Sequence, residues 1–170
     1  MKKLLLCAAF AAFGFTMNAQ DDASGNALSE GSWLIEINTG SWATGSTAFS
    51  LMSVDGNTAY SLGAEAGYFV MENLAIKAGL GYSDSDAADG TFAYKLGAKY
   101  YIGGEFPVGL DFTGVSNDGN NANWVGLQGG YAWFVAPNVS IEPTVRYNVT
   151  LDDQKADSAF QGLIGFAFHF

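Results

Sequence analysis

One pattern constrains this chain more than any other. From Gly31 to the C-terminus, apolar side chains alternate with small or polar ones in segments of about ten residues, separated by clusters of Gly, Asn, Asp and Ser. Because successive side chains of a strand point to opposite faces, a period of two indicates strands with one apolar face. No stretch favours a helix. The pattern predicts eight strands, at residues 32–40, 60–69, 74–82, 92–102, 108–114, 125–133, 139–148 and 160–170.

The two faces of these strands differ in charge and in size. The apolar face carries no charged residue, and the opposite face is rich in small residues such as Gly63, Gly79, Gly97 and Gly126. The interior of an eight-stranded barrel is only just wide enough for side chains, and charges in such a core must be paired. We therefore expect the small face inside, with a balanced ion-pair network made of Glu36, Glu65, Lys77, Lys95, Lys99, Asp111, Glu142 and Arg146.

A soluble eight-stranded barrel of the lipocalin or streptavidin type would turn the apolar face inward instead. Its water-facing side would then be rich in Gly and Ala, which have poor strand propensity. Aromatic residues near the ends of the apolar face fit the two interfaces of a membrane. These observations predict an all-β fold, an eight-stranded antiparallel up-and-down transmembrane β-barrel. Its expected aromatic girdles are Trp33, Tyr60, Tyr68, Tyr82, Tyr100, Trp133 and Tyr147.

The connections between the predicted strands alternate in length. The longer ones are residues 41–59, 83–91, 115–124 and 149–159, and the shorter ones are 70–73, 103–107 and 134–138. Transmembrane barrels show this alternation, with an even strand count placing both termini at the short-turn, periplasmic end. The apolar residues of loop 41–59 either fold over the barrel mouth or form a partner-binding patch. They are Trp42, Phe49, Leu51 and Met52.

Pro143 lies on the apolar face of the predicted strand 139–148. Proline cannot donate a hydrogen bond to a ladder, and a closed barrel has no free edge to accommodate it. We expect a bulge or a local register break at this position.

The N-terminus has the layout of a secretory signal peptide. Lys2 and Lys3 precede an uncharged apolar run that contains Cys7, and small and polar residues follow it. We expect residues 1–20 to be cleaved, residues 21–31 to form a periplasmic tail and residues 32–170 to form the barrel domain.

Little in the sequence points to catalysis or to a cofactor. The formal net charge of −10 argues against a nucleic-acid partner, since binding phosphates requires Lys and Arg. The single histidine, His169, is interpreted as a polar interior residue rather than as a catalytic base. Asp84, Asp86 and Asp89 are weak candidates for a divalent-cation site, without the glycine and distal glutamate of a calcium-binding loop. No cofactor is expected.

Three stretches resemble the OmpA/OmpX-type superfamily of eight-stranded barrels from the outer membrane of Gram-negative bacteria. Residues 67–82 and 130–143 resemble the strand-turn-strand signature of the generic outer-membrane β-barrel domain. The ending resembles the C-terminal signal read by the barrel-assembly machinery, with Phe166, Phe168 and Phe170 on one face. The resemblance implies a monomer in the outer membrane, in contact with lipid and lipopolysaccharide.

Taken together, these features predict a non-enzymatic integral barrel with a plugged ionic interior and acidic extracellular loops, active in envelope integrity or surface interaction. Two alternatives stay open. One is a small-solute pore of porin-like function, and the other is a lipid-modifying outer-membrane enzyme. Acidic outer residues such as Asp152, Asp153 and Asp157 also suggest bridging through divalent ions to lipopolysaccharide phosphates.

Overall fold

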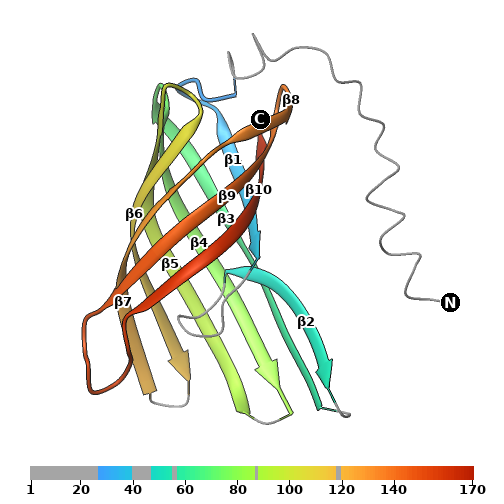
Figure 1. Cartoon of the computed structure of the whole chain (residues 1–170), viewed down its shortest axis with the longest axis vertical. Coiled ribbons are helices and arrows are strands. Elements are labelled where there is room, and N and C mark those ends of the chain that lie inside the picture. The colour runs from blue at the N-terminus through green and yellow to red at the C-terminus, as the bar shows by residue number, and fades with distance from the viewer. Residues whose placement is uncertain (1–26, 40–46, 55–56, 87, 118–119) are drawn as a thin grey trace, which may run out of the picture.

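The computed structural model describes residues 27–39, 47–54, 57–86, 88–117 and 120–170 (Figure 1). The expected signal peptide and the start of the expected tail lie outside these residues. Within the described ranges, no helix is long and apolar enough to cross a membrane. The elements are β1 (Trp33–Thr39), β2 (Ala48–Val54), β3 (Asn57–Met71), β4 (Leu74–Ser85), β5 (Ala88–Ile102), β6 (Phe106–Asn117), β7 (Asn120–Gly130), β8 (Trp133–Ala136), β9 (Val139–Thr150) and β10 (Ala159–His169).

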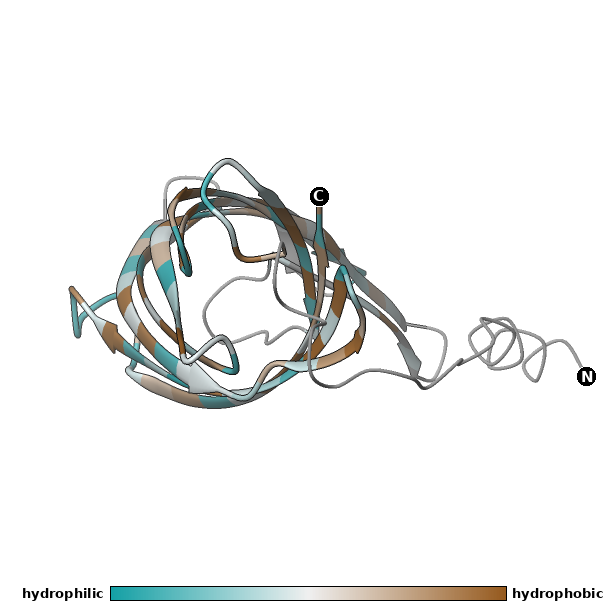
Figure 2. Cartoon of the chain, turned by 90° about the horizontal axis from the view of Figure 1, so that it is seen from above, coloured by the Kyte–Doolittle hydropathy of each residue, from teal (hydrophilic) through white to brown (hydrophobic). Residues whose placement is uncertain are grey.

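The strands close into a barrel. β3 to β7 pair in sequence order, β7 pairs with β9, and β9 pairs with β10. β1 completes the ring, because it pairs with β3 on one side and with β10 on the other. All of these pairings are antiparallel, and the view along the barrel shows the ring they form (Figure 2). The predicted eight-stranded antiparallel barrel is confirmed.

Two short strands, β2 and β8, were not among the eight predicted. β8 continues β7 in the same register against β9, since Gly130 pairs with Thr144 and Trp133 pairs with Ile141. β2 forms a hairpin with β3 and touches the end of β1 in parallel over two residue pairs. The interpretation of residues 41–59 as one loop is therefore wrong for its second half.

The hydrogen-bond ladder that joins β7 and β8 to β9 has a gap at Pro143, without a shift in register. The β9–β10 ladder runs through the pair Ile164 and Pro143 without a shift. On the other side, the Tyr131 amide donates to the Pro143 carbonyl (3.1 Å), but proline has no N–H to return the bond. The next amide, that of Ala132, donates instead to the Glu105 carbonyl in the neighbouring turn (2.6 Å). The ladder resumes at Trp133, so the expected register break is wrong.

The strands are longer than predicted at the end opposite the termini. β4 and β5 are separated only by residues 86–87, and β6 and β7 only by residues 118–119. The long connections predicted at 83–91 and 115–124 are therefore wrong. The outward positions here carry Asp, Ser and Asn, so the apolar alternation fades although the backbone ladder continues. Residues 151–158, between β9 and β10, keep a longer connection.

At the other end, two turns need residues with positive φ. Gly103 (φ 61°) and Gly104 (φ 78°) join β5 to β6, and Asn73 (φ 64°) precedes β4. Glycine adopts this conformation without steric cost, and asparagine is the residue that tolerates it next best. Both ends of the barrel chain lie at this same mouth, where Trp33 and Phe170 exchange main-chain hydrogen bonds (Figure 1).

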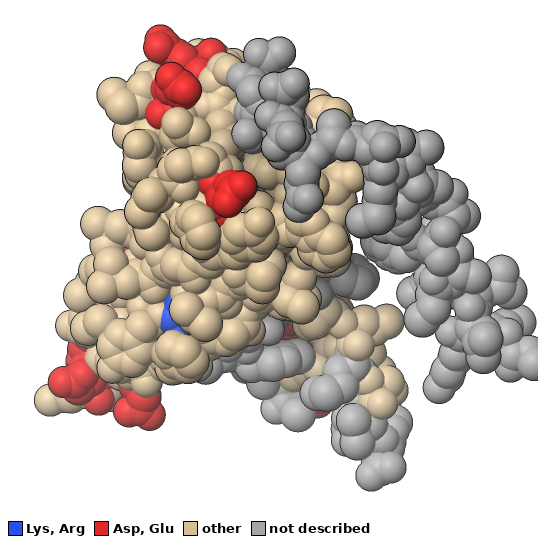
Figure 3. All heavy atoms as spheres, turned by 45° about the horizontal axis from the view of Figure 1, so that its top comes forward, with Lys and Arg blue, Asp and Glu red and all other residues tan. Residues whose placement is uncertain are grey.

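The apolar face of the strands points outward. Leu96, midway along β5, is 60% exposed, and Leu110 and Leu127 are similarly exposed on neighbouring strands. Figure 3 shows a broad uncharged side surface, with Asp and Glu gathered toward the ends of the barrel. All eight expected charged residues point inward; seven of them are buried, and Lys95 is partly buried.

Candidate functional site: the charged barrel interior

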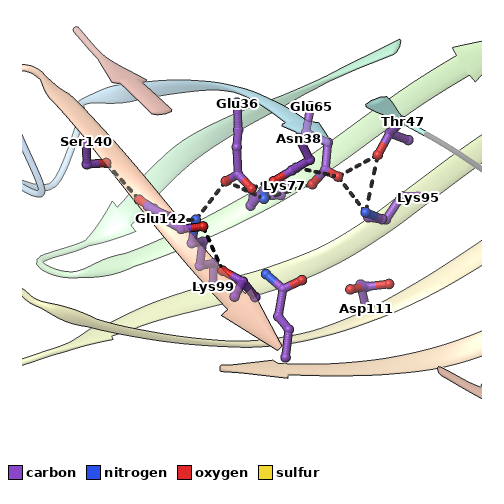
Figure 4. Close-up of polar contacts among 12 residues, drawn as sticks. Glu36, Asn38, Thr47, Glu65, Lys77, Lys95, Lys99, Asp111, Ser140 and Glu142 are labelled. Atoms are coloured by element: carbon purple, nitrogen blue, oxygen red, sulfur yellow. Dashed lines mark hydrogen bonds and ion pairs between the residues drawn. The ribbon is translucent and has the colours of Figure 1, made fainter. Parts of the chain in front are cut away.

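Six of the inward charges form one continuous chain of ion pairs (Figure 4). Lys77 Nζ lies 2.7 Å from Glu36 Oε2 and 2.8 Å from Glu65 Oε2. Lys95 Nζ lies 2.5 Å from Glu65 Oε1, and Lys99 Nζ lies 2.7 Å from Glu36 Oε2. Lys99 also pairs with a third acid at the end of the chain. In order of contact the members are Lys95, Glu65, Lys77, Glu36, Lys99 and Glu142.

The strand register explains why Lys77 is central. Glu36 on β1 lies directly opposite Glu65 on β3. Like charges opposite one another on adjacent strands repel and are destabilising. Lys77, on the next strand, reaches back over Gly67 to contact both carboxylates and lies between the two like charges. Lys95 and Lys99 add further positive charge at Glu65 and Glu36. Three acids and three bases then make this network neutral.

Neutral polar groups satisfy the remaining oxygens of the network. The Tyr101 hydroxyl donates to Glu142 Oε1 (2.9 Å), and the Ser140 hydroxyl donates to the same oxygen (2.8 Å). The Thr47 hydroxyl donates to Glu65 Oε1 (2.6 Å). Tyr101 and Ser140 stand at inward strand positions, where alternation alone could have placed them. Thr47 lies between β1 and β2, outside any regular pattern, and no sequence signal marks its entry into the interior.

The two remaining charged residues, Asp111 and Arg146, form a separate ion pair, nearer the end of the barrel opposite the termini. Arg146 contacts both carboxylate oxygens of Asp111 with its two terminal guanidinium nitrogens, Nη1 and Nη2, and Nη2 lies 2.6 Å from Asp111 Oδ1. Arg146 also donates to the side-chain oxygens of Gln128 (3.0 Å) and Asn148 (2.7 Å). A bidentate Arg–carboxylate pair with further hydrogen bonds is the arrangement in which buried charges are best tolerated. This cluster is also neutral.

Glycine positions leave the space that these side chains occupy. A Cβ added at Gly126 would strike the Arg146 guanidinium, and one added at Gly79 would lie 2.8 Å from Glu65 Cγ. A Cβ at Gly97 would strike the Asp111 side chain and lie 2.5 Å from the Leu110 carbonyl oxygen. The small residues of the inward face are therefore the steric complement of the charged ones.

Gly97→Ala is therefore expected to destabilise the barrel by about 1–3 kcal/mol, because a rigid backbone atom of the adjacent strand opposes the new methyl group. Urea unfolding in detergent micelles measures the effect. Gly129→Ala is the matched control, since no atom lies within 4 Å of its added Cβ, and it should be neutral or slightly stabilising. Equal unfolding midpoints for the two variants would contradict this steric account.

Both ends of the charged interior are covered. At the short-turn end lies an apolar cluster whose buried members are Leu28, Leu34, Phe69, Ala75, Tyr101, Ala132 and Ala167, with Phe134 packed against it. At the other end, the buried Trp124 indole donates from Nε1 to the Asp157 carbonyl in the β9–β10 connection (3.0 Å). Neither the apolar cluster nor this indole contact was foreseen in the sequence, because each joins residues distant along the chain.

His169 lies in the apolar cluster and is 1% exposed. Its ring packs on Phe69, Tyr101 and Phe134, with centroid distances of 6.1, 6.2 and 5.4 Å. The fold brings Ser140 Oγ to 3.3 Å from His169 Nε2, a neighbour that the sequence spacing did not indicate. Both side chains are buried, and the Ser140 proton is directed to Glu142. The contact therefore offers no surface to a substrate.

Two of the three predicted cation candidates, Asp84 and Asp86, accept local hydrogen bonds. Asp86 Oδ2 accepts from the Thr58 amide (2.6 Å), and Asp84 Oδ2 accepts from the Tyr60 hydroxyl (3.4 Å). The side chain of Asp89 lies outside the described residues. Among the side chains that the structure describes, no three His, Cys, Asp or Glu residues are grouped so as to hold a metal ion.

The rings expected to form girdles are all exposed on the outer surface. Trp33 packs edge-on against Tyr68 (centroids 5.2 Å apart) beside the terminal residue pair at the short-turn end. Tyr60 and Tyr82 lie together (6.5 Å) toward the opposite end. The remaining three exposed rings of that set are Tyr100, Trp133 and Tyr147, and the side chains of Phe166, Phe168 and Phe170 also face outward.

Of the comparisons with known proteins, the one with solved structures agrees with this architecture. Neither the comparison with protein families nor that with curated proteins finds a match. Among solved structures, the N-terminal β-barrel domain of Pseudomonas aeruginosa OprF matches with a TM-score of 0.53 and 15% identity, over 83% of this chain and 98% of that one. The chain has the fold of an outer-membrane barrel. The predicted resemblance to eight-stranded outer-membrane barrels is thereby confirmed at the level of the fold.

A second structure, that of the Yersinia pestis outer membrane protein Ail, matches with a TM-score of 0.47 and 12% identity, over 83% of this chain and all of that one (100%).

Proposed function

We propose that this protein is a non-enzymatic integral barrel of the outer membrane that keeps its interior closed and contributes to envelope integrity or surface interaction through its acidic outer end. The observation that carries the proposal is the pairing of an exposed apolar belt with an interior filled by compensated charges. In this proposal both termini face the periplasm. Membrane lipid and lipopolysaccharide surround a monomer, and the assembly machinery reads Phe166, Phe168 and Phe170.

The exposed belt supports a lipid environment. Large apolar side chains are exposed on every barrel strand, including Ile35, Leu62, Leu80, Val108 and Ile164. In water, a continuous apolar surface of this kind would cause aggregation. In a bilayer it is the favoured surface, and the closed ladder satisfies the backbone polar groups that lipid cannot. The belt therefore favours a membrane barrel over a soluble carrier with the same strand count.

The filled interior supports a closed barrel rather than a pore. The two neutral ion-pair clusters, the apolar cluster at one mouth and Trp124 at the other leave the charged atoms almost inaccessible to solvent. An ion crossing this path would have to separate pairs that compensate one another in a poorly hydrated core, which costs several kcal/mol per charge.

We therefore expect the purified protein to give no large, stable conductance steps in planar lipid bilayers. The control is the same preparation after heat denaturation, which should behave identically, while gel mobility with and without boiling verifies that the tested sample is folded. A stable single-molecule pore in the folded sample alone would contradict the closed interior and support the small-solute pore.

A further inference from the structure

The segment just before β1 crosses the short-turn mouth of the barrel. The Leu28 carbonyl accepts a hydrogen bond from the Asn73 amide (2.8 Å), and the Gly31 amide donates to the Phe69 carbonyl (2.9 Å). A local turn joins Ser32 N to the Ser29 carbonyl (3.1 Å). The Leu28 side chain is 3% exposed and belongs to the apolar cluster. We call residues 27–32 the N-terminal strap.

The strap packs on the apolar cluster that adjoins the ion-pair network at this mouth. Leu28 shares the apolar cluster with Tyr101, whose hydroxyl bonds Glu142 and whose ring lies 5.1 Å from Lys99 Nζ. His169 lies in the same layer, where its buried ring meets the backbone of Ala27 in the strap. A buried polar ring of this kind would form hydrogen bonds with water if the strap moved away.

The strap is a short segment at the edge of the fold. Its buried side chains are Ala27 and Leu28, Ser29 and Ser32 make further interactions, and main-chain bonds join it to Phe69 and Asn73. By contrast, β9 and β10 share a ladder of ten residue pairs. Transfer of one buried leucine side chain to water shifts the equilibrium between the bound and the detached strap on the order of 10- to 100-fold. Detachment of the strap breaks its main-chain bonds to Phe69 of β3 and to Asn73 but leaves the ladders between the barrel strands in place. The barrel can therefore stay closed while its mouth opens.

We propose that the N-terminal strap is a releasable seal, which controls whether water reaches His169 and the adjoining end of the ion-pair network. This inference rests on the proposed closed interior, because a seal has no role over an open pore. Anything that draws the chain away from the mouth at Leu28 would hydrate Lys99 and Glu142 and weaken their pairing. Opening would therefore be regulated from the end that carries both termini.

Cysteine accessibility tests the seal. Ala132→Cys places a thiol at a 2% exposed position of the cluster, in a full chain where Cys7 is replaced by serine. A charged, water-soluble methanethiosulfonate reagent is expected to label this thiol slowly in the parent chain. Leu28→Ser should accelerate labelling on the order of 10- to 100-fold. Leu151→Ser, at an exposed leucine of the β9–β10 connection, is the matched control and should leave the rate unchanged.

The outcomes separate the two proposals. Rapid labelling in the parent chain would overturn the closed interior itself. Slow labelling in both the parent and Leu28→Ser would overturn the seal and leave the closed interior standing. Leu28→Ala should give an intermediate rate, and the mobility of unboiled samples reports folding. Loss of the folded band in both Leu28 variants would also overturn the proposal, since a releasable seal is dispensable for the barrel.

Discussion

Arg146→Met is expected to destabilise the folded barrel by about 3–5 kcal/mol, because it leaves the buried Asp111 carboxylate without its only close cation among the described residues. The substitution also strands the side-chain oxygens of Gln128 and Asn148, which accept hydrogen bonds from the guanidinium group. Urea unfolding in lipid vesicles, followed by tryptophan fluorescence, measures the loss.

Removal of both Asp111 and Arg146 should destabilise the barrel much less than removal of Arg146 alone. In the double variant Asp111→Leu/Arg146→Met, no buried charge is left uncompensated, so most of the lost stability should return. Lys155→Met is the surface control, because Lys155 and its partner Asp152 are 58% and 42% exposed and 3.4 Å apart. Its effect should be within about 1 kcal/mol. A single Arg146 variant as stable as this control would refute the buried-pair account.

Leu96→Arg is expected to destabilise the barrel in vesicles by about 2–4 kcal/mol, the cost of placing a guanidinium group near the midplane of a bilayer. Leu96 is 60% exposed, and its neighbours across the ladder are Ala78 and Phe112, whose side chains also face outward. The free energy of unfolding is measured by urea titration in vesicles of fixed lipid composition.

The same substitution discriminates between lipid and water as the surrounding medium. An exposed side chain of a water-soluble barrel tolerates arginine within about 0.5 kcal/mol. Leu51→Arg is the matched control, since Leu51 is 70% exposed on β2, in the hairpin beyond the β1 end, where we expect a much smaller effect. A small loss at Leu96 equal to that at Leu51 would argue against a lipid-facing belt.

The fold was predictable from local sequence because strand alternation is a local property. Residues such as Ile76 and Lys77 occupy opposite faces in whatever sheet their strand joins, so the composition of each face can be read directly. The prediction failed where the outward residues become polar. The extended ends of β4 to β7 keep their backbone ladder although the apolar signal fades there. From the sequence alone, the apolar residues of β2, among them Leu51, are interpreted as part of a loop rather than of a strand.

The identities of the inward charges likewise came from alternation, but their partners did not. That Lys77 bridges Glu36 and Glu65, or that Arg146 selects Asp111, depends on which strands become neighbours and on their stagger. Thr47 and Leu28 contribute from segments outside the strands, which carry no periodic pattern.

Sequence alone therefore established the fold class, which face of each strand is apolar, and the neutrality of the interior. All three follow from the residue types that recur at every second position. Only the closed barrel decided the pairing of the charges, the contact of Ser140 with His169 and the covering of one mouth by Leu28. Those features join residues far apart in the chain, and their geometry is fixed by strand register rather than by any local preference.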